Sequence, residues 1–355
     1  MGTSSLICPS PPTLLASLTS NPLCLSRNPN FAKIPKSFSS FSSMSSSTGL
    51  PITACSATGA SKEERLQVGA SRVVGEADLL IVGPGVLGRL VAQKWRQEYP
   101  GCQIYGQTAT VDHHDELIQV GISPSLKGTT LGHKFPYVIF CAPPSRSPDY
   151  AGDIREAASN CNGEGSFLFT SSSAPYDCHD NGLCDENTLD VPIGRSPRTD
   201  VLLKAEKAAV DSGGCVVRLA GLYISFDNLY GLRFNLNSQY TADRGAHAYY
   251  LEKGTVDQRP DHVLNLIHYE DAASLSIAIL KKNLCGRIFL GCDSHPLSRQ
   301  EMMDLVSTSG KFSKKFVGFT GTDGPLGKRL NNSRSRAELG WEPKYPSFAE
   351  FLETL

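Results

Sequence analysis

The sequence predicts an α/β fold, a doubly wound parallel sheet with a smaller C-terminal substrate region. Strand-like and helix-like segments alternate along the chain, which is typical of βαβ units. The strand-like segments are continuous apolar runs, such as YVIFCA at residues 137–142, and such runs indicate strands covered on both faces. The first run, LLIV at residues 79–82, leads through the glycine-rich turn GPGVLG into an amphipathic segment.

Apolar runs define the predicted strands, and apolar residues three to four positions apart define the predicted helices. We expect strands at residues 79–82, 103–106, 137–142, 166–171, 215–219 and 287–290, and helices at residues 86–98, 112–120, 149–161, 199–212, 271–281 and 299–307. Two more helices are expected in the tail, one ending at Gly340 and one following Pro346. Residues 222–260 are aromatic and polar without clear periodicity, so we assign no element there.

The glycine-rich turn has the spacing G-x-G-x-x-G between a strand and a helix. Gly83 would make the tight turn, Gly85 would let a pyrophosphate approach the backbone, and Gly88 would let helix and strand pack closely. The N–H groups at the start of the following helix, at Val86 and Leu87, would face the phosphates. The turn therefore predicts a dinucleotide site in a Rossmann sheet, and a Rossmann-like domain without a ligand is the alternative.

The end of the second strand governs the choice between NAD and NADP. An NAD site usually has Asp or Glu there to bind the ribose 2′-OH, whereas this chain reads YGQTAT at residues 105–110. The missing carboxylate removes the repulsion of a 2′-phosphate, and Thr108, Thr110, Arg89 or His113 could donate hydrogen bonds to it. The sequence therefore favours NADP as the cofactor, with NAD as the alternative.

The first 60 residues differ in composition from the rest of the chain. They contain no Asp or Glu and are rich in Ser, Thr and Pro. This composition is typical of an organellar transit peptide, and the scarcity of arginine favours the chloroplast, in its stroma, although an ordinary disordered tail is the alternative. We expect a transit peptide at 1–55, a linker at 56–76, an NAD(P)-binding Rossmann domain at 77–225, and a partly interleaved C-terminal substrate region at 226–355.

Charge and hydropathy argue against several kinds of partner. The formal net charge is −1, so the sequence indicates no nucleic-acid partner. No apolar stretch reaches the roughly 18 residues that span a bilayer, so we expect no membrane span. The expected partner is a small-molecule substrate, and the oligomeric state stays open, with a homodimer among the alternatives.

Cysteine spacing predicts no metal site. The chain has 11 Cys, none of them in a C-x-x-C pair. The one cluster that resembles a metal site is CHDNGLCD at residues 178–185, and we interpret it as a surface loop with free thiols. A redox-sensitive pair of Cys178 and Cys184 is the alternative.

Further motifs follow the glycine turn in a fixed order. They read TSSSAPY at residues 170–176, RLAGLY at 218–223, IHYED at 267–271, KRLNN at 328–332 and ELGW at 338–341. With the glycine turn, these motifs resemble the extended short-chain dehydrogenases/reductases of the NAD-dependent epimerase/dehydratase superfamily, in the form of its atypical members. The resemblance covers about residues 78–355 and implies an NAD(P)-binding Rossmann fold.

The resemblance also implies a place for each catalytic residue. Active members use a Ser, a Tyr that acts as general acid/base, and a Lys that lowers the pKa of this Tyr. Carried onto this chain, the serine falls on Ser172, the tyrosine on Arg198 and the lysine on Leu202. Neither Arg198 nor Leu202 can take over the role of the residue it replaces. Tyr176, on the same loop as Ser172, is the candidate stand-in proton donor, and a packed aromatic side chain is the alternative.

Other positions around the ligands follow from the same resemblance. Ala142, Pro143 and Pro144 would run past the ribose and the pyrophosphate, where a purely structural turn is the alternative. Leu222 would border the nicotinamide ring.

Two functions stay open on the sequence. The first is an NADP-dependent oxidoreductase or epimerase/dehydratase-like enzyme acting on a small, anionic or sugar-like substrate. Arg195 and Arg198 could hold an anionic group of that substrate, although exposed loop arginines without a ligand are the alternative. The second function is a non-catalytic nucleotide-binding or scaffold protein of the plastid. The missing Tyr–Lys dyad favours the second function, whereas the glycines and Ser172 favour the first.

Overall fold

The computed structural model describes residues 74–225 and 243–355, which all belong to one compact unit, Gln67–Leu355. The predicted transit peptide and most of the predicted linker lie outside the described residues. The segment 226–242, at the start of the predicted C-terminal region, also lies outside them.

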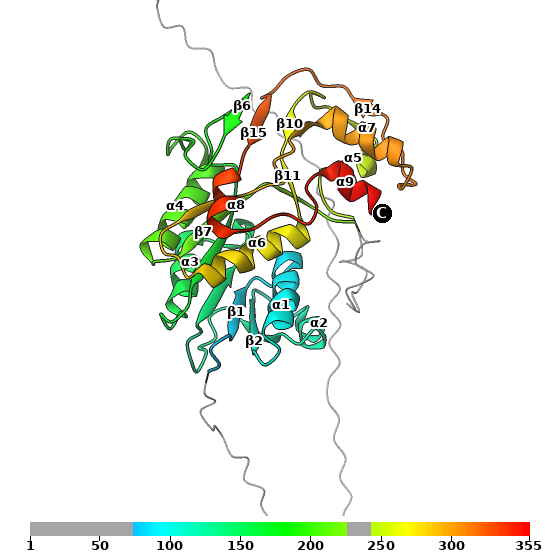
Figure 1. Cartoon of the computed structure of the whole chain (residues 1–355). Coiled ribbons are helices and arrows are strands. Elements are labelled where there is room, and N and C mark those ends of the chain that lie inside the picture. The colour runs from blue at the N-terminus through cyan, green and yellow to red at the C-terminus, as the bar shows by residue number, and fades with distance from the viewer. Residues whose placement is uncertain (1–73, 226–242) are drawn as a thin grey trace, which may run out of the picture. The chain divides into compact units, whose positions relative to one another are not determined.

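A seven-stranded parallel sheet forms the centre of the described unit (Figure 1). Its strands are β1 (Leu79–Val82), β2 (Ile104–Thr108), β3 (Ser123–Leu126), β4 (Tyr137–Phe140), β5 (Phe167–Ser172), β7 (Cys215–Leu219) and β12 (Ile288–Gly291). They lie in the order β12-β7-β5-β4-β1-β2-β3, and every neighbouring pair is parallel. The predicted doubly wound parallel sheet is confirmed.

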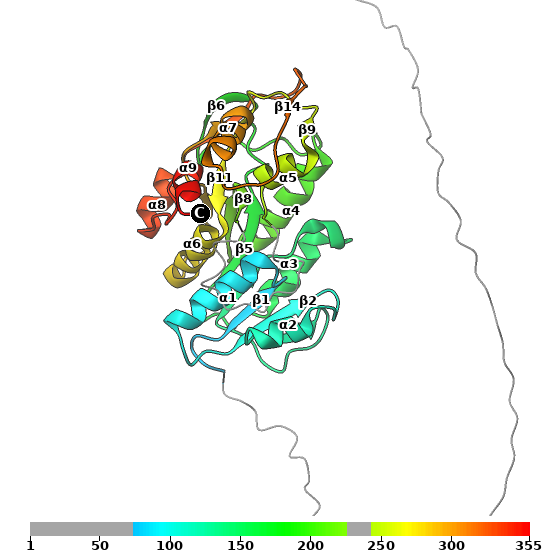
Figure 2. The same ribbon diagram turned by 90° about the vertical axis from the view of Figure 1, so that its right-hand side faces the viewer.

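Helices cover both faces of this sheet, because its strands are apolar on both sides. The helices around it are α1 (Val86–Glu98), α2 (His114–Gln119), α3 (Tyr150–Ser159), α4 (Pro197–Asp211), α6 (Tyr269–Lys282) and α8 (Ser333–Leu339). Leu79 and Ile81 of β1 belong to the core shared with α1 and α6, whereas Leu80 between them belongs to the core shared with α3 and α4. Figure 2 shows α1 with α6 on one side of the sheet and α3 with α4 on the other.

The C-terminal region gathers beyond one end of the main sheet (Figures 1 and 2). Two earlier strands, β6 (Asp180–Cys184) and β8 (Gly221–Tyr223), pair with strands of this region. Its own elements are α5 (Ala246–Lys253), β9 (Thr255–Val256), β10 (Val263–Leu264), β11 (Leu266–His268), β13 (Leu297–Ser298), α7 (Arg299–Ser309), β14 (Gly318–Phe319), β15 (Gly327–Leu330) and α9 (Phe348–Glu353). One small sheet has the order β13-β10-β15-β6, and two pairs, β11-β8 and β14-β9, complete the region. β12, which comes from the C-terminal part of the chain, joins the main sheet beside β7.

The structure corrects three sequence expectations. β3 reads SPSL and α5 lies in the stretch without periodicity, so neither had the apolar pattern by which we assigned elements. Residues 178–185 were expected to be a surface loop with free thiols; residues 180–184 instead form the strand β6, which pairs in parallel with β15 and buries Cys184, while the thiols of Cys178 and Cys184 are free. Among the helices of the described ranges, none is long and apolar enough to cross a membrane.

Candidate functional site

A cleft of about 520 Å³ lies at the carboxyl ends of β1, β2 and β4. The strand order reverses between β1 and β4, and a doubly wound sheet binds its ligands at such a switch point. Of the predicted cofactor residues, those that line the cleft are Gly83, Gly85, Val86, Thr108, Ala142 and Pro143. The structure therefore brings the glycine turn, the end of the second strand and the turn after the fourth strand to one cleft.

Each glycine of the turn meets a different constraint. Gly83 has φ +81°, and a Cβ there would lie 2.6 Å from the backbone of Ala142, so only glycine fits. A Cβ on Gly88 would lie 2.8 Å from Ile81 Cγ2, which explains the close packing of α1 on β1. A Cβ on Gly85 would meet nothing within 4 Å, so this backbone faces open space in the cleft.

The turn is held to its neighbours by hydrogen bonds. Gly83 N donates to Gln107 O over 2.9 Å, which ties the turn to β2. Arg89, almost fully buried, donates from Nε to Pro84 O over 3.3 Å and forms an ion pair with Glu116 at 3.1 Å. The first N–H groups of α1 have no acceptor within the helix, so the helix presents donors at the cleft. This arrangement suits the pyrophosphate of a dinucleotide.

No Asp or Glu of the segment after β2 is among the residues that line the cleft, although Asp112, beside the lining, accepts a hydrogen bond from Thr110 over 2.9 Å. The cleft wall after β2 is lined by Gln107, Thr108, Ala109, Thr110 and His113. The Thr108 hydroxyl contacts Thr110 O at 2.8 Å and His114 Nε2 at 2.7 Å. Beside this wall, Lys127, the residue after β3, donates from its backbone N–H to Thr108 O over 2.8 Å. Its Nζ forms an ion pair of 2.5 Å with Asp153 of α3, and both residues line the cleft.

Four predicted cofactor residues do not line the cleft. Leu87 and Gly88 pack against the core, Pro144 opens a short 3₁₀ helix, η1 (Pro144–Arg146), and Leu222 on β8 is half-buried against the core. Sequence reasoning also missed several lining residues, among them Cys141, Arg146, Arg244, Tyr269 and Lys127. The first two flank the predicted turn and could have been included, but Arg244 and Tyr269 reach the cleft only through long-range packing.

Ser172 lies in a second cavity, of about 280 Å³. It is the last residue of β5, and its cavity is also lined by His179, His262, Asn265 and Lys328. The two cavities have no lining residue in common. The structure therefore does not bring the candidate catalytic serine into the lining of the glycine cleft.

Tyr176 is fully buried below the Ser172 loop. Its hydroxyl has no hydrogen-bond partner in the described part of the chain, and burial raises the pKa of this phenol well above its usual value. The Arg218 guanidinium stacks over its ring at 4.5 Å from the centroid. This environment favours the packing alternative for Tyr176 over the role of proton donor.

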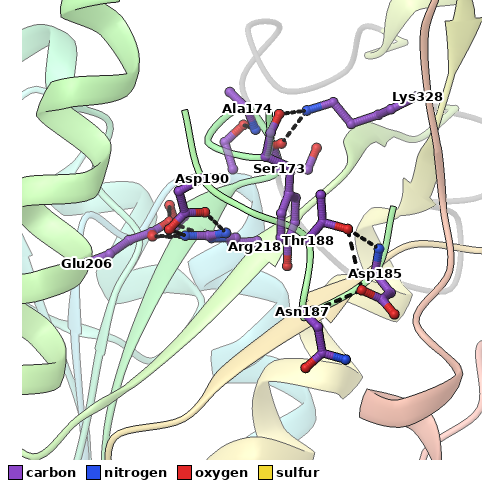
Figure 3. A network of polar contacts seen from close by, with 12 residues as sticks. Ser173, Ala174, Asp185, Asn187, Thr188, Asp190, Glu206, Arg218 and Lys328 are labelled. Carbon is purple, nitrogen blue, oxygen red and sulfur yellow. Dashed lines mark hydrogen bonds and ion pairs between the residues drawn. The ribbon is translucent and has the colours of Figure 1, made fainter. Parts of the chain in front are cut away.

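A buried ion-pair network holds the same loop (Figure 3). Arg218 donates to Glu206 and to Asp190, each at 2.6 Å, and Ser171 donates to Glu206 over 2.5 Å. From the other side, Lys328 Nζ donates to the carbonyl oxygens of Ser173 at 3.1 Å and Tyr176 at 2.6 Å. These contacts fix the backbone around Ser172.

Solved structures with the same fold cover most of this chain. A functionally unknown conserved protein from Silicibacter pomeroyi is 21% identical, with a TM-score of 0.60 over 78% of this chain and 97% of that chain. dTDP-glucose 4,6-dehydratase from Bacillus anthracis, in complex with NAD, is 15% identical, with a TM-score of 0.59 over 78% and 94% of the two chains. UDP-glucuronic acid 4-epimerase from Bacillus cereus, in complex with NAD, is 14% identical, with a TM-score of 0.56 over 78% and 94%.

The chain has the fold of these epimerases and dehydratases. No protein-family model matches the chain, and no curated protein matches it. The fold expected from the motif resemblance is thus confirmed, while the levels of identity say nothing about substrate or activity.

On α4 of this epimerase-like fold, the positions of the expected dyad carry no acid/base pair. Arg198 is exposed in the first turn of the helix, and Leu202 is 7% exposed in the core between α3, α4 and the sheet. Arg195 is also exposed and contacts Asp177 through two hydrogen bonds of 2.6 and 2.7 Å. Neither arginine lines either of the two cavities, so their location gives no support to a substrate-binding role.

Proposed function

We propose that this chain binds a nicotinamide dinucleotide in the glycine cleft and prefers NADP to NAD. The open space over the Gly85 backbone carries the proposal, because it lies at the N-terminus of α1 and at the switch point of the sheet. Two solved structures of the same fold were determined with NAD bound, which supports a cofactor of this class.

The preference for NADP rests on the wall after β2. A carboxylate there would bind the 2′-OH of NAD and repel the 2′-phosphate of NADP, and the lining residues of this wall include none. The basic side chains of Arg89 and Lys127 line the same cleft and attract a phosphate. Each also contacts a carboxylate, Glu116 or Asp153, so we propose a preference for NADP and not an exclusion of NAD.

We further propose that nucleotide binding, without the proton transfer of the usual dyad, is the main role. The exposed Arg198 and the packed Leu202 support this role of a non-catalytic nucleotide-binding or scaffold protein. The second candidate is an oxidoreductase or epimerase/dehydratase-like enzyme with a different acid/base. One observation favours it, namely that Ser172 and Lys328 line the same cavity.

We also propose that residues 1–55 direct the protein to the plastid stroma. The acid-free, serine-rich composition of the leader supports this location. A fusion of residues 1–55 to a fluorescent protein, expressed in leaf cells, is expected to enter chloroplasts. Fluorescence that stays outside them would reject the location without affecting the proposed cofactor.

Cofactor binding is tested by titrating the full chain with NADPH and NADH and following the reduced nicotinamide fluorescence. The wild-type chain is expected to bind both, with tighter binding of NADPH. Gly85→Val places a branched side chain in the open space where the pyrophosphate would lie, so we expect the affinity for NADPH to fall about hundredfold.

The matched control is Gly101→Val. Gly101 also has open space around its Cβ position, but it lies after α1 and outside the cleft lining. The Gly101→Val variant should therefore leave the affinity for NADPH unchanged. Absence of binding to the wild-type chain, or equal binding by both variants, would reject the proposed site.

A further inference from the structure

The second cavity contains a partly buried cation that has no ion-pair partner within residues 74–225 and 243–355. Burial lowers the pKa of Lys328, and no ion pair joins its Nζ to a carboxylate of the described residues. The negative charge of Asp177 favours the charged form of Lys328, but both carboxylate oxygens of Asp177 accept hydrogen bonds from Arg195. No Asp or Glu is among the residues that line the cavity.

The position of Lys328 is fixed by its surroundings. Asn265 Nδ2 donates to Lys328 O, and Asn265 Oδ1 accepts from Leu330 N, both over 2.8 Å, so β15 is held at the lysine and two residues after it. Two N–H groups of the ammonium bind the carbonyl oxygens of Ser173 and Tyr176. An ammonium has three N–H groups, so one donor is left for a ligand.

Among the other polar residues that line this cavity, Ser172 can donate to an anion and complete a site with Lys328. The Ser172 hydroxyl oxygen accepts from Ala174 N over 3.2 Å, which leaves its hydrogen available for donation. His262 Nδ1 donates to Pro325 O over 2.7 Å, and burial lowers the pKa of this ring, so its neutral form presents Nε2 as an acceptor and offers no donor to an anion. Both residues line the cavity.

We propose that the second cavity binds a small oxyanion, the carboxylate or phosphate group of a small molecule, between Lys328 Nζ and the Ser172 hydroxyl. The volume of about 280 Å³ suits a small metabolite, because drug-sized pockets start at about 300 Å³. The two cavities share no lining residue, so we expect the anion to bind without the dinucleotide. Lys328 thereby takes the anion-binding role that the sequence suggested for Arg195 and Arg198.

The direct test is lysine footprinting of the full chain. The rate of acetylation of each lysine is measured by mass spectrometry with chloride alone, with inorganic phosphate and with acetate at equal ionic strength. Phosphate, acetate or both should slow the labelling of Lys328 about tenfold at saturation, as a charge-assisted hydrogen bond implies. Lys204, exposed on α4, serves as the internal control and should not change. Protection by phosphate alone or by acetate alone identifies the anion class, and equal labelling of Lys328 in all three salts overturns the proposal.

Two variants locate the bound anion. Ser172→Ala keeps Lys328 and should raise about fivefold the phosphate concentration that half-protects Lys328 from acetylation. Ser159→Ala, a control on the exposed surface of α3, should leave this half-protection concentration unchanged. Gly85→Val should lose NADPH binding and keep the protection of Lys328. Loss of this protection in Gly85→Val, or an unchanged half-protection concentration in Ser172→Ala, would contradict the site.

Discussion

The glycine cleft and the second cavity differ in how the chain builds them. Part of the cleft lining is one contiguous turn, residues 83–86, set between the ends of neighbouring parallel strands. The second cavity joins the loop after β5 to β10 and β15, and its contact between Ser173 and Lys328 spans 155 residues of sequence. A binding site made by one local motif can be predicted from sequence, whereas a site made by long-range strand pairing needs the structure.

The two sites also differ in what would hold a ligand. The cleft offers backbone N–H groups at a helix N-terminus, which need no side chain to be present. The cavity offers side chains, and the loop that carries Ser172 is held by buried charges. Substitutions of buried charges should therefore affect the cavity more strongly than the cleft.

The largest effect is expected for Arg218→Ala. Arg218 is 2% exposed, and its removal leaves Glu206 buried without a cation. We expect the free energy of unfolding to fall by about 3–5 kcal/mol, measured by denaturant titration. The control is Arg195→Ala, whose exposed ion pair with Asp177 should contribute at most about 1 kcal/mol. Similar losses for both variants would mean that the network does not support the loop.

A smaller effect is expected when the cleft is given the carboxylate it lacks. Thr108→Asp places a negative charge at the end of β2, where it can bind the 2′-OH of NAD and repel the 2′-phosphate of NADP. The ratio of NADPH to NADH affinities should fall about tenfold, which is about 1.4 kcal/mol, in the fluorescence titration. Thr130→Asp, on exposed chain after β3, should leave the ratio unchanged. If Thr108→Asp keeps the wild-type ratio, the wall after β2 does not select the cofactor.

The smallest effect concerns pH. Only the ammonium form of Lys328 attracts an anion, and burial lowers the pKa of this group below its usual 10.5. Phosphate binding should therefore weaken as the pH rises toward this lowered pKa, by about threefold between pH 8 and 10, in calorimetric titrations of the Gly85→Val chain. NADPH binding to the wild-type cleft should change less over this range, because backbone amides do not titrate. A phosphate affinity that is constant or increases with pH would contradict the role of Lys328.

Much of the Rossmann half could be predicted because most of its strands begin with or consist of a continuous apolar run. The helix at residues 86–98 has the predicted bounds, and the turn before it lines the cleft. β3 was missed because SPSL lacks an apolar run, yet backbone pairing with β2 makes it a strand. β6 was missed for a similar reason, since its pairing with β15 lies beyond any local pattern.

The candidate site was predicted only where it is local. Gly83, Gly85 and Thr108 follow strand ends, so topology alone places them at one edge of the sheet. Lys328 was assigned to a tail motif without a role, because nothing in its neighbourhood indicates that β15 returns to the loop after β5. The dyad positions were assigned through the resemblance, and the packing of Leu202 in the core agrees with the loss of a lysine there.

The central claim is that the chain has two separate sites, one for a dinucleotide and one for a small oxyanion. A crystal structure of the full chain grown with NADP and phosphate tests it most directly. We predict the pyrophosphate against the backbone of Gly85 and Val86, a phosphate ion within hydrogen-bond distance of Lys328 Nζ and Ser172 Oγ, and no part of the dinucleotide in the second cavity. A dinucleotide bound away from the glycine turn, or one that reaches Lys328, would contradict the claim.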